Sequence, residues 1–289
     1  MLDGRGSGPY NMGVDEALLE TAIRAGLPTL RFYTWRGPWL SLGYGQRESA
    51  LDGGPSASQR PAVVDNTGTN RAGGGGAPES RLAILAGEGG GMVRRSTGGR
   101  AVLHGCDLTY SLAAPAEYLP AGLRPAYLLI ASALAGALAR LGVAVEREPL
   151  KRSAGREARF DCFAFPAQDE LCVGGQKLVG NAQRRTRAGV LQHGSIRMAP
   201  ETDRVRALLG LEGGVATSLA EQGCKASEED LRGACIASFR EALCADFEEH
   251  GLEGHELLRA RSRGFEPLPE VPAAGPSAAS YVRGSFPSC

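Results

Sequence analysis

The sequence lacks an excess of charge of either sign and a long apolar run. Its 289 residues include 32 lysines and arginines against 32 aspartates and glutamates, so the formal net charge is zero. This balance argues against a general nucleic-acid-binding protein, although it leaves room for a local basic patch. The longest apolar run, residues 126–139, is too short and too rich in small residues to span a bilayer. We expect no contact with nucleic acid or membrane.

The sequence also lacks a regular pattern of cysteines and an N-terminal apolar segment typical of a signal peptide. Its seven cysteines form an odd set without disulfide-type spacing, which in a chain of this length predicts a reduced, cytoplasmic protein. No group of histidine, cysteine and acidic residues has the spacing of metal ligands. Cys235 belongs to a stripe repeating every four residues with Leu231, Phe239 and Leu243, so we predict it to be part of the core.

What the sequence does contain is an alternation of helical and strand-like segments. Apolar periodicity predicts a helix over residues 11–25 with Asn11 as its N-cap, and a later helix headed by a capping box of Ser227 and Asp230. Two further helices are predicted, over residues 81–86 and 120–141. Strands are predicted over residues 29–35, 39–44, 93–95, 101–104, 108–112 and 143–146, the first two as a hairpin.

The most informative stretch runs from residue 160 to residue 198. Near its start is Cys162, and after a first extended run Gly174-Gly175 leads into a second extended run that carries Lys177. Two glycines between extended runs predict a β-hairpin, because both residues can adopt positive φ. A second hairpin is predicted at residues 184–189, and the two together form a small antiparallel meander.

Cys162 and Lys177 together suggest acyl-transfer chemistry. A thiolate is a good nucleophile, and a nearby cation lowers the pKa of a thiol. A positive group can also stabilise the carbonyl oxygen of an acyl intermediate. The same spacing would also be found if Cys162 were an inert buried thiol and Lys177 a solvated strand residue. The spacing alone therefore leaves both the catalytic and the structural interpretation open.

A second candidate site surrounds the turn over residues 96–99, whose Gly98 and Gly99 allow backbone N–H groups to approach a ligand closely. Arg94 and Arg95 precede these glycines, and such a turn suits an anion or a carbonyl group. His104 follows the turn, either as a hydrogen-bonded structural residue or as a general base. Many ordinary hairpins contain a similar pattern.

Taken together, these motifs resemble the lipoate- and biotin-protein ligase superfamily, and most closely its cysteine-dependent octanoyltransferase branch. The ligase branch has a similar lysine-glycine segment but does not need a cysteine at this position. Cys162 is therefore the residue that distinguishes the two branches. Arg100 stands where many members carry a third glycine. The matching segments are Cys162-Phe163, Gly175-Gln176-Lys177-Leu178-Val179-Gly180-Asn181-Ala182-Gln183, Gln192-His193-Gly194-Ser195 and the RRxxGG motif that begins at Arg94, followed by His104.

The resemblance implies an α+β fold, with a mixed, largely antiparallel sheet and helices on one face. We expect residues 1–200 to form the catalytic domain, residues 201–266 a helical extension packed on it, and residues 267–289 a loose tail. The segment 48–79, rich in glycine, is expected to be an inserted surface loop, either a tolerated insertion or a regulatory segment.

The function implied by the resemblance is octanoyl transfer. Octanoyl-acyl carrier protein would be the donor, a lysine of a lipoyl-domain protein such as the glycine-cleavage H protein the acceptor, and Cys162 the thioester-forming nucleophile. Lys177 would orient or polarise the carbonyl, and neither ATP, nor a metal, nor another cofactor would be required. The substrate would contact Arg94, Arg95, Thr97, Gly98, Gly99, His104, Gly180, Ala182, Gln183, His193 and Gly194.

Three alternatives remain open from the sequence. The first is an ATP-dependent lipoate-protein ligase, in which Cys162 would be incidental. The second is an amidotransferase that uses acyl-H protein as donor, and the third is an inactive paralogue that only binds carrier or lipoyl-domain proteins.

Overall fold

The computed structural model describes residues 3–46, 81–147, 169–201, 216–262 and 280–285. Cys162, its neighbour Phe163 and the segment 48–79 lie outside the described residues. No helix within the described ranges is long and apolar enough to cross a membrane.

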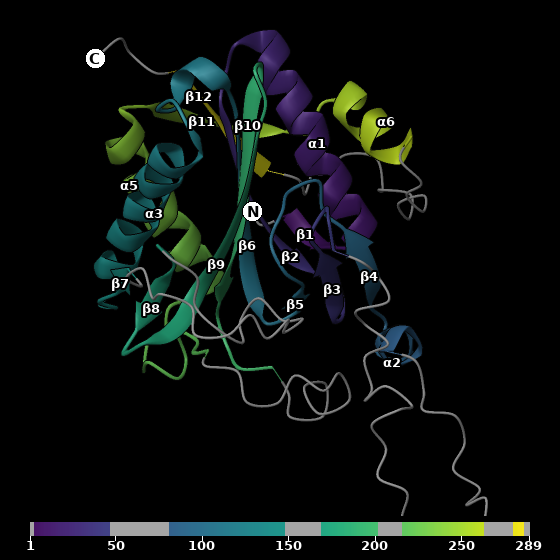
Figure 1. Ribbon diagram of the computed structural model, residues 1–289, viewed down its shortest axis with the longest axis vertical. Helices are drawn as coiled ribbons and strands as arrows, with labels where there is room; N and C mark the ends of the chain where they lie inside the picture. The colour runs from purple at the N-terminus through teal and green to yellow at the C-terminus, as the bar shows by residue number, and fades with distance from the viewer. Residues whose placement is uncertain (1–2, 47–80, 148–168, 202–215, 263–279, 286–289) are drawn as a thin grey trace, which may run out of the picture.

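The described residues form two sheets and several helices (Figure 1). The strands are β1 (Asp3–Gly6), β2 (Thr29–Trp35), β3 (Trp39–Leu42), β4 (Gly91–Arg94), β5 (Val102–His104), β6 (Asp107–Pro115), β7 (Glu146–Arg147), β8 (Leu171–Val173), β9 (Gln176–Arg185), β10 (Gly189–Arg197), β11 (Asp246–Gly251) and β12 (Ser280–Ser285). The helices are α1 (Gly8–Ala25), α2 (Arg81–Gly87), α3 (Leu123–Arg140), α5 (Glu228–Leu243) and α6 (Gly254–Ser262), with a 3₁₀ turn η2 (Ala116–Tyr118).

The larger sheet has nine strands in the order β11-β12-β2-β6-β10-β9-β8-β7, with β1 added in parallel to β2. Its other pairings are antiparallel. The expectation of a mixed, largely antiparallel sheet flanked by helices is therefore confirmed. Both predicted hairpins are also present, because Gly174 and Gly175 adopt φ of 55° and 74° and join β8 to β9, while residues 186–188 join β9 to β10.

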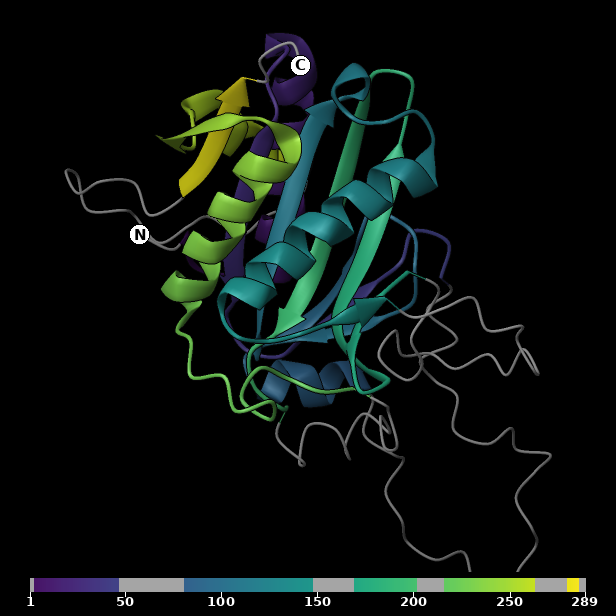
Figure 2. The same cartoon turned by 90° about the vertical axis from the view of Figure 1, so that its left-hand side faces the viewer.

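Helices cover both faces of this sheet, which corrects the expectation of helices on one face only. Figures 1 and 2 show α3 and α5 on one side and α1 and α6 on the other. Alternation along β2 explains the two layers, since Leu30 and Phe32 join the core beneath α3 and α5, whereas Arg31 points to α1. With every residue of β2 buried, neither face could be left to solvent.

The expected hairpin of residues 29–35 with 39–44 is wrong. Strand β3 leaves β2 and belongs to a separate three-stranded sheet in the order β4-β3-β5, parallel to β4 and antiparallel to β5. The edges of β2 are already occupied by β6 on one side and by β1 and β12 on the other, so no ladder position remains for β3. Strands of both sheets line a common cavity.

Helix α1 begins earlier than predicted, and its N-cap is Ser7 rather than Asn11. The Ser7 hydroxyl accepts the N–H of Tyr10, and a proline in the first turn fits because its missing N–H would have no partner there. Asn11 instead makes a tertiary contact, because its side-chain amide donates to the carbonyl of Thr34 at 3.1 Å. The capping box of Ser227 and Asp230 at the start of α5 is confirmed, as is the burial of Cys235.

The chain after residue 200 departs most from the sequence-based expectation. Strands β11 and β12 extend the main sheet, and β12 pairs directly with β2, so this region is not only helical. Residues 280–285 therefore contradict the expected loose tail from residue 267. The predicted strand over residues 143–146 shortens to β7, because Val143 instead packs into the core below α3.

Candidate functional site

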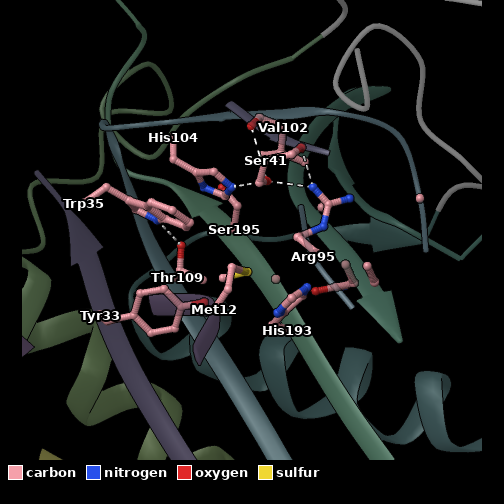
Figure 3. Close-up of a pocket in the computed structure, with 15 residues that line it drawn as sticks. Met12, Tyr33, Trp35, Ser41, Arg95, Val102, His104, Thr109, His193 and Ser195 are labelled. Atoms are coloured by element: carbon pink, nitrogen blue, oxygen red, sulfur yellow. Dashed lines mark hydrogen bonds between the residues drawn. The ribbon is translucent and has the colours of Figure 1, made fainter. Parts of the chain in front are cut away.

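A cavity lies between the two sheets, where the separation of β3 from β2 leaves room (Figure 3). It encloses about 370 Å³ of empty space, part of which opens to solvent. Its lining comes from α1, β2, β3, β5, β6, β9, β10 and the turn after β4. The residues are Met12, Tyr33, Trp35, Ser41, Arg95, Gly99, Val102, His104, Thr109, Gly180, Asn181, Ala182, His193, Gly194 and Ser195.

The fold brings residues of the RRxxGG segment and His104 together with residues of the β9 and β10 motifs, which lie much later in the sequence. Of the expected substrate-contacting residues, seven line this cavity: Arg95, Gly99, His104, Gly180, Ala182, His193 and Gly194. The hairpin of β9 and β10 places Gly194 directly opposite Asn181, and β6 pairs with β10 on its other side. Adjacent strands of one sheet therefore deliver two of the motifs to one wall.

His104 is held by a chain of hydrogen bonds at one end of the cavity. Its Nδ1 lies 2.8 Å from Oδ2 of Asp107, and its Nε2 lies 2.7 Å from the hydroxyl oxygen of Ser41. Its ring stacks on Trp35 with centroids 4.0 Å apart. Burial raises the pKa of the Asp107 carboxyl, but the charge and hydrogen bond of His104 outweigh burial and lower it overall.

His193 has a second acidic partner in Asp15, at 3.2 Å from Nδ1 to Oδ2, and its Nε2 lies 2.6 Å from the Thr97 hydroxyl. Asp15 also accepts hydrogen bonds from Arg31 at 2.9 Å and from Tyr33 at 2.8 Å. Asp15 and Arg31 are each 1% exposed, so this is a fully buried ionic network. It fixes the orientation of His193 in the cavity wall.

The network makes the stability of the folded protein depend on pH. Burial lowers the pKa of His193 below its ordinary value, and the pairing with Asp15 offsets this only in part. The unfolded chain therefore binds more protons below about pH 6.5, so the free energy of unfolding falls as the pH decreases through that value. The pKa of Asp15 is also lowered, because the bonds from His193 and Arg31 outweigh burial, which adds a further loss below about pH 4.

We therefore expect the melting temperature to fall between pH 7 and pH 5, measured by differential scanning calorimetry. A His193→Asn variant, which cannot take up the proton, should show a shallower slope over the same interval. An equal slope in both proteins would assign the pH dependence to other groups.

Arg95 connects the twin-glycine turn to the cavity. Its guanidinium donates to the carbonyl and the hydroxyl oxygen of Ser41, both at 2.6 Å, and to the carbonyls of Gly98 and Arg100. Gly99 has φ of 90°, which only glycine adopts readily, and its carbonyl approaches Gly43 so closely that a Cβ on Gly43 would lie 2.0 Å away. Arg95 thus holds the turn in place and also forms part of the cavity wall.

The remaining predicted residues lie away from the cavity lining. Arg94 is exposed and donates to the carbonyls of Gly43 and Gln46, and Gly98 is an exposed part of the turn. Thr97 does not line the cavity itself, but its hydroxyl is hydrogen-bonded to His193, which does. Gln183 bonds to Gln192 at 2.6 Å and does not line the cavity.

Lys177 is fully buried and does not line this cavity. Its ammonium donates to Oε1 of Glu170 at 2.5 Å, and both side chains are almost completely shielded from water. The pair lies where β8 and β9 begin, next to Thr217, whose N–H donates to the carbonyl of Lys177. A buried ammonium of this kind requires its carboxylate, since an unpaired buried charge is strongly destabilising.

Sequence reasoning missed the cavity residues from the N-terminal half of the chain: Met12, Tyr33, Trp35, Ser41, Val102 and Thr109. Only the pairing of β3 with β5 brings Ser41 to His104, and no local pattern signals that contact. Asn181 and Ser195 lie inside the quoted motifs and could have been included from them.

None of the described cysteines lines the cavity, and none is an exposed thiol activated as a nucleophile there. Cys172 and Cys235 are fully buried, and burial raises the pKa of the Cys235 thiol to about 12. Burial and the neighbouring Glu201 and Asp107 also raise the pKa of Cys106. These thiols are therefore poor nucleophiles at neutral pH.

Comparison with known proteins agrees with the motifs and the fold. The family model of the lipoyl protein ligase A/B catalytic domain matches residues 7–248. The chain is 40% identical to the octanoyltransferase LipM of Moorella thermoacetica over 91% of this chain and 85% of that protein. It is 33% identical to the octanoyltransferase LipM of Kyrpidia tusciae, over 88% and 89% of the two chains.

A solved structure of similar fold comes from an archaeal lipoylation system, described as a bi-partite lipoate protein ligase and its E2 lipoyl domain from Thermoplasma acidophilum. It superimposes with a TM-score of 0.61 at 20% identity, over 91% of this chain and 92% of that one. At this identity the likeness concerns the fold alone. The family match and the two curated relatives show that this chain belongs to the lipoyl protein ligase A/B catalytic-domain family, in its octanoyltransferase branch.

Proposed function

We propose that this enzyme transfers an octanoyl group from octanoyl-acyl carrier protein to a lysine of a lipoyl-domain protein, through a thioester on Cys162. The observation that carries the proposal is the cavity between the sheets, to which three of the motif segments contribute residues, namely the RRxxGG segment with His104, the segment 175–183 and the segment 192–195. Its lining includes the apolar side chains of Met12, Trp35, Val102 and Ala182. An acyl chain buried there would gain roughly 0.8 kcal/mol for each CH₂ group.

The reaction divides into two acyl transfers. The Cys162 thiolate attacks the donor carbonyl, a new carbon–sulfur bond forms, and the carrier thiolate leaves and takes up a proton. The acceptor lysine amine then attacks the enzyme thioester, forms the amide and releases the Cys162 thiol. Neither step consumes ATP.

The proposed acceptor and the proposed donor rest on different observations. A lipoyl-domain acceptor fits the family and the archaeal neighbour, whose description pairs the ligase with a lipoyl domain. The carrier-protein donor rests on the resemblance of the Cys162 motif to cysteine-dependent octanoyltransferases.

Lys177 is proposed to polarise the acyl carbonyl as a charged ammonium. To remove it without stranding Glu170, we would replace both residues, as Lys177→Met with Glu170→Gln. We expect acyl-enzyme formation to slow by about 10²- to 10³-fold, the usual effect of losing one donor to a developing oxyanion. Rapid-quench mass spectrometry measures this rate, and an unchanged rate in a folded double variant would assign the pair a structural role only.

The second candidate is an ATP-dependent lipoate-protein ligase, favoured by the fold shared with ligases. In that reaction a free acid is activated as an adenylate and Cys162 is not needed. Product formation from free octanoate that depends on ATP would separate it from the transferase.

The experiment that tests the proposal is intact-protein mass spectrometry after mixing with octanoyl-acyl carrier protein without ATP. We expect an octanoyl adduct that neutral hydroxylamine removes. An adduct only with octanoyl-H protein would identify an amidotransferase. Binding of the carrier or lipoyl-domain protein with no adduct and no product, with or without ATP, would identify an inactive paralogue.

A further inference from the structure

Ser41 and His104 lie in the cavity wall (Figure 3), and Asp107 continues their hydrogen-bonded chain away from the cavity; the Cys162 reaction does not use this chain. The Ser41 hydroxyl oxygen lies 2.7 Å from Nε2 of His104, and Nδ1 of His104 lies 2.8 Å from Oδ2 of Asp107. A hydroxyl, an imidazole and a carboxylate in this order and at these distances are the arrangement by which a serine becomes a nucleophile. We propose that Ser41 is a second acyl-accepting nucleophile, with His104 as its general base and Asp107 as the group that orients the base.

The surrounding bonds determine which atoms carry protons. Asp107 also accepts the Thr109 hydroxyl at 2.9 Å and the N–H of Gly105 at 3.0 Å, which favours its ionised form. The carboxylate places a proton of His104 on Nδ1, and in the neutral imidazole, the form that acts as a base, Nε2 is then the acceptor. The Ser41 oxygen accepts from Arg95 at 2.6 Å, and its one proton has two acceptors within reach, Nε2 of His104 at 2.7 Å and the carbonyl of Val102 at 3.4 Å. The shorter contact favours Nε2.

Two further features favour nucleophilic chemistry. The cation of Arg95 stabilises negative charge as it develops on Ser41 and on an adjacent carbonyl oxygen. The stacked ring of Trp35 holds the imidazole of His104 in one plane. In Figure 3, Ser41, His104 and Arg95 lie along one side of the cavity, with Met12 and Tyr33 across from them as contacts for an acyl chain.

The proposed step is balanced without any co-reactant. Ser41 Oγ forms a bond to the carbonyl carbon of an acyl thioester, the carbon–sulfur bond breaks, and the hydroxyl proton passes through His104 Nε2 to the departing thiolate. The product is an octanoyl ester of Ser41, and this choice of substrate rests on the proposed function. Because Ser41 and His104 are buried away from bulk water, we expect the ester to accumulate rather than to hydrolyse quickly.

The experiment uses the full-length chain with Cys162→Ala, so that the serine is observed alone. An alkyl fluorophosphonate, which reacts with activated serines whatever the natural substrate, is followed by intact mass and peptide mapping. We expect labelling at Ser41 and, with octanoyl-acyl carrier protein, an adduct that resists neutral hydroxylamine. The Ser238→Ala control removes a buried serine of α5 outside the cavity and should leave both signals unchanged.

Variants of the triad distinguish chemistry from folding. Asp107→Asn keeps the side-chain size but reverses the bond to His104, so labelling should slow by about 10²- to 10⁴-fold. Ser41→Cys should convert the octanoyl adduct to one that hydroxylamine removes, whereas Ser41→Ala should lose it. No labelling of Cys162→Ala, or labelling that persists in Ser41→Ala, would overturn the proposal. Fluorophosphonate labelling without an octanoyl adduct would overturn the octanoyl thioester as the substrate of Ser41 while supporting the nucleophile. The adduct on the protein that retains Cys162 tests the proposed donor separately.

Discussion

Replacing Cys162 by alanine is expected to lower the rate of octanoyl transfer by at least about 10³-fold, because the reaction loses the nucleophile that divides it into two steps. Any remaining transfer would arise from direct attack of the acceptor amine on the bound donor, or from a slower nucleophile such as Ser41. The measurement is the appearance of octanoylated lipoyl domain by mass spectrometry, with octanoyl-acyl carrier protein as donor.

Cys244→Ala is the matched control, because Cys244 is an exposed thiol at the end of α5, remote from the cavity lining. It should transfer at the wild-type rate. Wild-type activity in Cys162→Ala would contradict the thioester mechanism. If that activity also required ATP and used free octanoate, the ligase mechanism would replace it.

Replacing Asp15 by alanine is expected to reduce the free energy of unfolding by about 3–5 kcal/mol, because it leaves the buried Arg31 guanidinium without its carboxylate. The same carboxylate accepts the hydroxyls of Tyr33 and Ser111, so the loss extends beyond one ion pair. Urea denaturation at pH 7 measures the change. His193 also loses its partner, so cavity binding should weaken in parallel.

Glu241→Ala provides the comparison at the surface. Glu241 also pairs with an arginine, Arg140, but the two side chains are 69% and 43% exposed. Water screens such a pair, and its removal should cost no more than about 1 kcal/mol. Equal losses in the two variants would show that the Asp15 network contributes no more than an ordinary surface contact.

Local patterns predicted those parts of the fold that depend on neighbouring residues. The helix ending at Ala25, strand β2, the twin-glycine hairpin of β8 and β9, and the capping box at Ser227 all match the structure, because a turn, a cap or a periodic face is specified within a few residues. The N-cap of α1 failed for a tertiary reason, since Asn11 is used to bind Thr34 instead.

Long-range pairing accounts for the expectations that were wrong. Residues 39–42 have the composition of a return strand, yet β2 already has partners on both edges, so β3 joins β4 and β5 instead. The strand β12 could not be anticipated from a segment rich in proline, alanine and serine, because what specifies it is its pairing with β2, far back in the chain.

The sequence by itself determined the family, through the RRxxGG, lysine-glycine and QHGS motifs and Cys162, because these short patterns carry the residue types that the chemistry needs. Only the tertiary structure decided that Arg95, His104 and His193 share one cavity, that Lys177 is held by Glu170, and that Ser41 meets His104. The physical reason is that burial and strand pairing depend on all the elements at once. A buried charge finds its partner across the whole chain rather than among its neighbours in sequence.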